Sequence, residues 1–171
     1  DSISTMYGSE NYSYLLSDLL GAQLRNAGVN RSTLSKMSEF VSGVDRYTAD
    51  IVDGNPDTVL IALGTNDALQ EVNPGVFRRD YETVLSGIRK RLPQSNVYTM
   101  SLLRSPLISS TRVLQYNNII REVSKESDAA YIDLYEKFSP TDFPDGLHPT
   151  KEAHVKIARV IYELLRKEVT L

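Results

Sequence analysis

The chain has 171 residues, of which 41% are hydrophobic and 24% are charged, values typical of a single folded domain spanning residues 1–171. The 22 Asp and Glu residues outnumber the 19 Lys and Arg residues, and the resulting net charge of −3 argues against a nucleic-acid-binding protein. The absence of cysteine excludes a disulfide scaffold, a thiolate zinc site and a cysteine nucleophile. No apolar run approaches the roughly 18–20 residues of a membrane-spanning helix, and two histidines without cysteine predict no metal site.

The first part of the chain alternates between helical and strand-like patterns. Residues 11–27 carry a broad apolar stripe at helical spacing, and residues 29–33 predict a short strand. A second helix is predicted over residues 36–52, ahead of the Gly-Asn-Pro break at 54–56. Residues 58–63, TVLIAL, form a continuous apolar run, which is typical of a strand buried on both faces of a parallel sheet.

The same alternation continues to the C-terminus. A helix is predicted over residues 74–92, with Pro in its first turn, followed by a strand over 96–102. A helix over 111–127 and a buried strand over 130–134 come next, and Thr150 caps a last helix that runs to about residue 167. Strands separated by helical crossovers predict a three-layer α/β/α domain with a doubly wound, flavodoxin-like parallel sheet.

Ligands of such sheets bind at the carboxyl ends of the strands, so the loops that follow strands carry the candidate site. Two of these loops contain unusual polar groups: Gly64-Thr65-Asn66-Asp67 directly after TVLIAL, and Asp145-Gly146-Leu147-His148-Pro149 ahead of the last helix. The chain start, Asp1-Ser2-Ile3-Ser4, is expected at the same edge of the sheet.

Together with the fold, these three motifs resemble the SGNH, or GDSL-type, esterase family. That family carries Gly-Asp-Ser after its first strand, Gly-x-Asn-Asp after its third strand and Asp-x-x-His near the C-terminus. The resemblance extends from Ser2 to the final helix, and it implies that Ser2 is the nucleophile, His148 the base and Asp145 the group that orients His148. It implies neither a cofactor nor a metal.

Each residue type suits its implied role. A serine hydroxyl is a poor nucleophile at neutral pH and needs a base, and imidazole serves because its ordinary pKa lies near 6.5. The base needs an acceptor on its other nitrogen, and Asp145 is three residues from His148 on one turn. The side-chain amide of Asn66 and the N–H of Ser2 are expected donors to the oxyanion. The resemblance also implies that an Asn at 117 or 118 ties its helix to a nearby loop.

The second block of the family, which supplies another backbone N–H to the oxyanion, departs from the usual pattern. The best register starts at Asn30 and places Ser35 where the family has Gly. Gly43 is the competing match, but it falls inside the predicted helix 36–52, where a glycine costs about 1 kcal/mol. Ser35 is therefore the preferred donor, with Gly43 as the alternative.

The family's first strand, which runs into Gly-Asp-Ser, has no counterpart here because Asp1 opens the chain. An empty central slot would leave backbone groups unpaired, so we expect a parallel strand between residues 29–33 and residues 58–63. The candidates are an N-terminal segment outside this sequence, a strand from a separate chain, and a circular permutation in which residues 168–171 fill the slot.

The resemblance implies a serine esterase that cleaves carboxylic esters through an acyl-enzyme, and the compact chain favours short acyl groups such as O-acetyl on a carbohydrate. Acyl transfer and lysophospholipase or thioesterase activity are alternatives within the family. A catalytically degenerate, carbohydrate-binding module is an alternative of another class. The expected partner is a small-molecule ester, such as an acylated carbohydrate or lipid, and not a nucleic acid.

Overall fold

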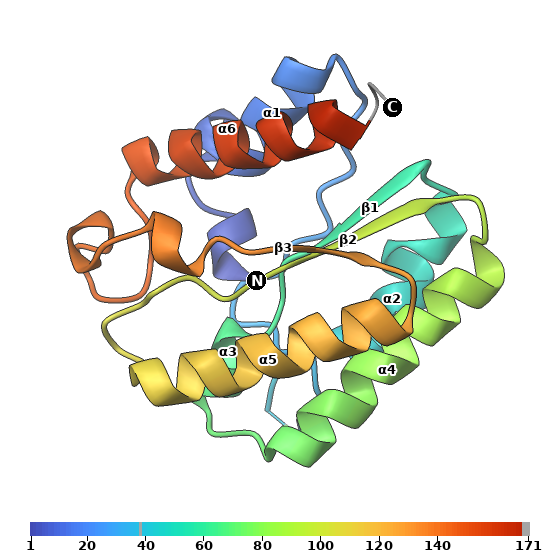
Figure 1. Ribbon diagram of the computed structural model, residues 1–171, viewed down its shortest axis with the longest axis horizontal. Coiled ribbons are helices and arrows are strands. Elements are labelled where there is room, and N and C mark those ends of the chain that lie inside the picture. Colours follow the sequence, from blue (N-terminus) through green and yellow to red (C-terminus); the bar gives the residue numbers. More distant parts are fainter. Residues whose placement is uncertain (38, 169–171) are drawn as a thin grey trace.

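A three-stranded parallel sheet forms the centre of the computed structural model, which describes residues 1–37 and 39–168 (Figure 1). The strands are β1 (Thr58–Ile61), β2 (Asn96–Met100) and β3 (Ala130–Ile132), and they pair in that order. Val59 lies opposite Val97 in the first pair, and Thr99 lies opposite Tyr131 in the second. The predicted α/β fold with a parallel sheet is confirmed.

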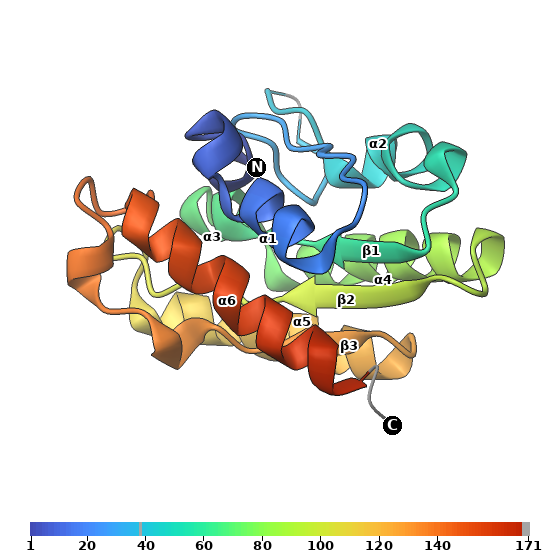
Figure 2. The ribbon, with the colours of Figure 1, turned by 90° about the horizontal axis from the view of Figure 1, so that it is seen from above.

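Helices cover both faces of this sheet and give three layers (Figures 1 and 2). One face carries α1 (Tyr12–Leu20) and α6 (Lys151–Glu168), and the other carries α2 (Gly43–Asp50), α4 (Pro74–Arg91) and α5 (Ser110–Glu126). A short helix, α3 (Thr65–Leu69), directly follows β1. The remaining helical turns are of the 3₁₀ type: Ser2–Ser4, Gly8–Glu10, Val52–Gly54, Tyr135–Lys137 and Pro140–Asp142.

The alternation of side chains along the strands divides the core into two clusters. Val59 and Ile61 of β1 pack with the buried faces of α4 and α5, whereas Leu60 packs on the other side with α1 and α6. Ile157 and Ile161 of α6 are fully buried in that second cluster. Because both faces of β1 pack against helices, the strand sequence after Thr58 is apolar without interruption.

The last three long helices follow the sequence prediction closely, since each has a local start signal. The side chain of Asn73 accepts a hydrogen bond from the N–H of Gly75 at the start of α4, and Pro74 is the first residue of that helix. Thr150 Oγ1 accepts from the N–H of Ala153 at 3.1 Å and caps α6 as predicted.

Two predicted helices are much shorter in the structure. The first ends at Gly21, which adopts φ 60°, and its N–H closes the helix by bonding to the carbonyls of Ser17 and Asp18. The second begins only at Gly43, because a parallel bridge between Thr33 and Ser42 holds the preceding segment in a loop. The prediction of helices over 11–27 and 36–52 was therefore wrong in extent.

The predicted strand over 29–33 is also absent, because Thr33 makes only that isolated bridge. Within the described residues no strand pairs with the outer edge of β1, so the expectation of a filled slot is not met there. The permutation candidate, residues 168–171, falls mostly outside the described residues, and Glu168 is the last residue of α6. The N-terminal segment, blue to cyan, lies beside β1 instead (Figure 2).

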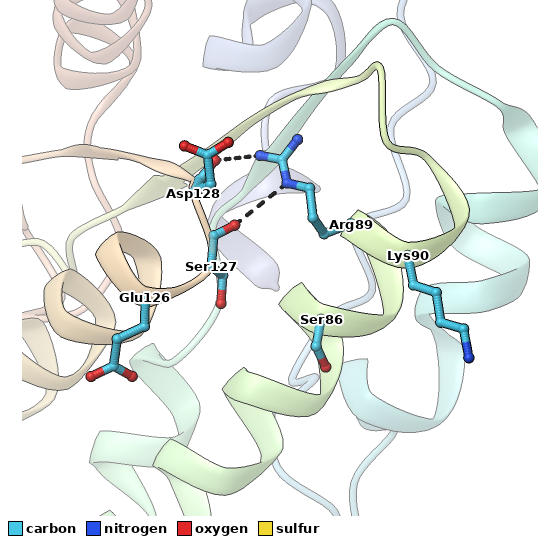
Figure 3. Close-up of a pocket in the computed structure, with 6 residues that line it drawn as sticks. All are labelled: Ser86, Arg89, Lys90, Glu126, Ser127 and Asp128. Atoms are coloured by element: carbon cyan, nitrogen blue, oxygen red, sulfur yellow. Dashed lines mark hydrogen bonds between the residues drawn. The ribbon is translucent and has the colours of Figure 1, made fainter.

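None of the helices in residues 1–37 and 39–168 combines the length and the apolar character needed to cross a membrane. A hollow lies between the C-terminal ends of α4 and α5, at the amino ends of the strands (Figure 3). The guanidinium of Arg89 fills its polar side by donating to the carbonyls of Ser127 and Asp128. These bonds satisfy carbonyls just past the end of α5, so Arg89 caps the C-terminus of that helix. The hollow lies away from the predicted site.

Candidate functional site

Ser2 is the first residue of a buried 3₁₀ turn, Ser2–Ser4, at the carboxyl end of the sheet. Asp1 caps this turn, and its Oδ1 accepts from the N–H of Ile3 at 3.0 Å. The carbonyl of Ser2 accepts the N–H groups of Thr5 and Met6. Among the hydrogen bonds of the described residues, none is donated by the N–H of Ser2, which stands at the open start of the turn. The nucleophile candidate is thus fixed while its own N–H stays available.

Asp145 organises the turn ahead of α6 through one oxygen. Its Oδ1 accepts the N–H of Leu147 at 2.9 Å and that of His148 at 2.7 Å. Gly146 adopts φ +82°, a left-handed conformation that glycine tolerates best, and it lets the chain double back in this way. The turn therefore places the His148 ring beside the other oxygen of the same carboxylate.

The structure brings the three predicted side chains into one hydrogen-bonded chain. His148 Nδ1 lies 2.6 Å from Asp145 Oδ2, and His148 Nε2 lies 3.0 Å from Ser2 Oγ. Asp145 is acceptor-only when ionised, so Nδ1 carries the proton and the lone pair of Nε2 faces the hydroxyl of Ser2. This arrangement allows Nε2 to accept the hydroxyl proton.

Hydrogen bonding keeps Asp145 ionised. Burial pushes its pKa upward, but the hydrogen bonds from the His148 N–H, the His148 ring and the Leu147 N–H outweigh it and lower the pKa to about 2. The side chains of Asp145 and His148 are 54% and 26% exposed, so the pair lies at an open surface. A carboxylate that is charged at all ordinary pH values gives the imidazole a constant partner.

Asn66 and Asp67 enter the site from α3, which lies beside the N-terminus in both views (Figures 1 and 2). Asn66 Nδ2 donates one hydrogen to the carbonyl of Ser32 at 2.8 Å, which leaves its second amide hydrogen for another acceptor. Asp67 is fully buried and accepts the N–H groups of Leu34 and Ser35 at 2.7 and 2.8 Å. Burial raises the pKa of Asp67, although both N–H groups act in the opposite direction.

These contacts correct the prediction for the second block. The N–H of Ser35 is bound to Asp67 Oδ1, so the structure does not support Ser35 as an oxyanion donor. The alternative, Gly43, is the first residue of α2 and not a mid-helix residue, but its N–H donates to the carbonyl of Thr33 at 2.8 Å. Both candidate N–H groups are committed elsewhere, and the available donors are the N–H of Ser2 and the amide of Asn66.

Sequence reasoning missed the contact that supports the Asp145 turn from outside. Ser105 Oγ donates to the carbonyl of Gly146 at 2.6 Å, and the N–H of Leu107 donates to the same carbonyl at 3.0 Å. The loop after β2 is therefore bonded to the loop ahead of α6. The predicted tie from Asn117 is confirmed, because its side chain bonds both the N–H and the carbonyl of Leu102.

Comparisons with known proteins agree with this architecture. The model of the GDSL-like lipase/acylhydrolase family matches residues 1–156. No relative is found among curated proteins. Similar solved structures include an acetyl xylan esterase, AlAXEase, with a TM-score of 0.80, 18% identity and coverage of 96% of each chain.

Two further solved structures are esterases. The psychrotrophic esterase EstA from Pseudoalteromonas sp., inhibited by monoethylphosphonate, has a TM-score of 0.79 and 20% identity, with coverage of 100% of this chain and 96% of that one. The inhibitor-bound aryl esterase of M. smegmatis has a TM-score of 0.79 and 16% identity, with coverage of 95% and 87%. At these identities the structures show a shared fold. The match of the family model to most of the chain places the protein in the GDSL-like lipase/acylhydrolase family, a family of carboxylic ester hydrolases.

Proposed function

We propose that the protein is a serine esterase that cleaves short-chain carboxylic esters through an acyl-enzyme on Ser2. The observation that carries the proposal is the continuous chain from Ser2 Oγ through both nitrogens of His148 to Asp145, with distances of 3.0 and 2.6 Å. Serine, base and orienting carboxylate in hydrogen-bond contact form the arrangement that activates a hydroxyl nucleophile.

The reaction follows from the positions of the protons. Ser2 Oγ attacks the ester carbonyl carbon while its proton passes to His148 Nε2, and Asp145 stabilises the resulting imidazolium. The tetrahedral intermediate collapses, and the alcohol leaves with the proton from Nε2. Water then attacks the acyl carbon and gives a proton to Nε2, and the carboxylic acid departs as Ser2 recovers its proton.

The oxyanion of each tetrahedral intermediate is proposed to accept hydrogen bonds from the N–H of Ser2 and the free amide hydrogen of Asn66. Both groups are held by other bonds before substrate arrives: Ser2 by its 3₁₀ turn and Asn66 by the carbonyl of Ser32. Donors fixed in advance pay no reorganisation cost during the reaction.

The preference for short acyl groups rests on the openness of the site. Asp145 is more than half exposed, and Leu107 is the exposed leucine in the loop bonded to the Asp145 turn. A long acyl chain needs a continuous apolar channel, whereas an acetyl group needs only a small contact. An O-acetylated carbohydrate, with a polar alcohol part in open solvent, fits these surroundings.

The test combines covalent labelling with a substrate series. A phosphonate inhibitor should modify Ser2, as mapped by mass spectrometry, and the Ser2→Ala variant should stay unlabelled. A series of p-nitrophenyl esters from acetyl to octanoyl, run beside acetylated sugars, should give the highest kcat/KM for the shortest acyl groups. Absence of both labelling and hydrolysis would favour a carbohydrate-binding module. Product formation on an added alcohol acceptor, in place of release of free acid, would identify acyl transfer.

A further inference from the structure

His154 lies on α6, six residues after His148, and its side chain is fully buried. Its ring stacks on Tyr12 with centroids 5.9 Å apart and meets Tyr7 edge-on at 5.2 Å. His154 Nδ1 accepts a hydrogen bond from the backbone N–H of Tyr12 at 3.2 Å. Tyr12 is the first residue of α1, where a backbone N–H has no partner within its helix. His154 therefore supplies a side-chain cap from another helix.

This bond fixes the protonation state of the ring. Nδ1 can accept only when it carries no proton, so His154 is neutral with its hydrogen on Nε2. Burial lowers the pKa of His154 to about 4, which keeps it neutral at ordinary pH. Nε2 is buried without a hydrogen-bond partner among the described residues. Nδ1 is thus the ring atom through which His154 makes its hydrogen bond.

The start of α1, which His154 caps, also contacts the turn that carries Ser2. The hydroxyl of Tyr12 lies 2.9 Å from Ser4 Oγ, and both groups are buried. The neighbouring Asn11 donates to the carbonyl of Ile3 at 2.7 Å and to that of Met6 at 3.0 Å. Side chains at the start of α1 therefore hold the Ser2–Ser4 turn by hydrogen bonds, and the side chain of His154 holds the start of α1 by another.

The two reacting side chains are connected twice. One connection is direct, from Ser2 Oγ to His148 Nε2. The other runs from the Ser2 turn through the start of α1 to His154, and back along α6 to the loop that holds His148. We infer that His154 is a positioning residue, whose Nδ1 keeps the Ser2 turn in place relative to His148. This inference rests on the proposed role of Ser2.

The test uses three substitutions that differ in where they place an acceptor. In His154→Asn the amide oxygen takes the place of Nδ1, in His154→Gln it reaches the place of Nε2, and His154→Leu removes the acceptor while it fills the space. Displacement of reacting groups by about 1 Å costs on the order of 100-fold in rate. We therefore expect kcat on p-nitrophenyl acetate to fall about 10- to 100-fold in the Leu and Gln variants, with KM little changed, and to stay within about threefold of wild type in the Asn variant.

Ile161→Val is the matched control, because it removes a buried methylene from the same helix and leaves the hydrogen bond between His154 and Tyr12 in place. It should lower the thermal midpoint and leave kcat unchanged. Circular dichroism establishes that each variant is folded at the assay temperature, and where the Leu variant is not, the Asn and Gln pair decides.

Equal kcat in the Asn and Gln variants, or wild-type kcat in a folded Leu variant, would overturn the positioning role. Wild-type protein that is neither labelled at Ser2 nor active would overturn the proposed function, and the inference with it. The wild-type sample reports on that point independently of the His154 variants.

Discussion

Replacement of Asp145 by Asn tests the proposed chemistry at a single proton. Asp145 Oδ1 accepts two backbone N–H groups, from Leu147 and His148, at 2.9 and 2.7 Å. In the Asn variant the carbonyl oxygen must keep this position, so the NH₂ group faces His148 Nδ1. An amide NH₂ donates, which forces Nδ1 to accept and moves the imidazole proton to Nε2. The lone pair that receives the proton of Ser2 is then absent.

We expect kcat on p-nitrophenyl acetate to fall about 10⁴-fold at neutral pH, as the same change does in serine proteases. That loss corresponds to about 5 kcal/mol of additional barrier. KM should change little, because the substitution affects the base and not a contact with the ester. The rate of phosphonate labelling at Ser2 should fall in parallel. The thermal midpoint should move only slightly, since both bonds that shape the turn remain.

Asp133→Asn is the control, because Asp133 also accepts a backbone N–H and pairs with a charged side chain, Arg121, but lies outside the hydrogen-bonded chain. Its kcat should match wild type. Retention of more than a tenth of the wild-type kcat by Asp145→Asn, or an unchanged labelling rate, would refute the argument about the imidazole proton.

Three further outcomes are expected. Ser2→Ala and His148→Ala should each lower kcat by about 10⁴- to 10⁶-fold, and a variant with a tenth of wild-type turnover would exclude that residue from the mechanism. Asn66→Ala should lower kcat by about 10²- to 10³-fold with KM little changed; a change confined to KM would show that Asn66 binds the ground state instead. The unfolded chain protonates His154 below about pH 6.5 but the folded protein only near pH 4, so the free energy of unfolding should fall on acidification through this window. In urea titrations this fall should be larger in wild type than in His154→Asn by up to about 3 kcal/mol, and identical pH dependence of the two proteins would contradict a buried, neutral His154.

Strands and helices with strong local signals could be predicted from sequence. After Thr58, the segment TVLIAL has no polar residue to mark an exposed face, and it lies between two helical layers. Asn73-Pro74 and Thr150 start α4 and α6 because a side-chain acceptor next to the first turn satisfies free N–H groups whatever the rest of the protein does.

The segment between Gly21 and Gly43 could not be predicted in the same way. Its apolar residues continue the helical spacing, but Gly21 takes a left-handed conformation that ends α1 early. Leu34 and Ser35 are then held by Asp67, more than 30 residues away in sequence. A buried carboxylate that collects N–H groups over such a distance leaves no local periodicity, so propensity alone favours the wrong element.

Within the candidate site, the sequence predicted a contact between side chains where that contact is local. Asp145 and His148 share one turn, and the sequence shows that directly. The prediction for Ser35 differs from the structure because its N–H could donate to either of two acceptors, an oxyanion or Asp67. Only the folded arrangement decides between them, and there the N–H donates to Asp67. The contribution of Ser105 was invisible because it depends on a contact across 41 residues.

That contact limits how the substrate range of the enzyme can be redesigned. The loop after β2 borders the site, which makes it an attractive place for loop grafting, yet the carbonyl of Gly146 takes both the hydroxyl of Ser105 and the N–H of Leu107. A grafted loop that lacks the hydroxyl, or that puts proline at position 107, would remove one of the two hydrogen bonds that hold the turn carrying His148, the proposed base. Libraries aimed at new esters should therefore keep Ser105, exclude proline at 107, and vary the Leu107 side chain, which is 58% exposed and packs over Gly146.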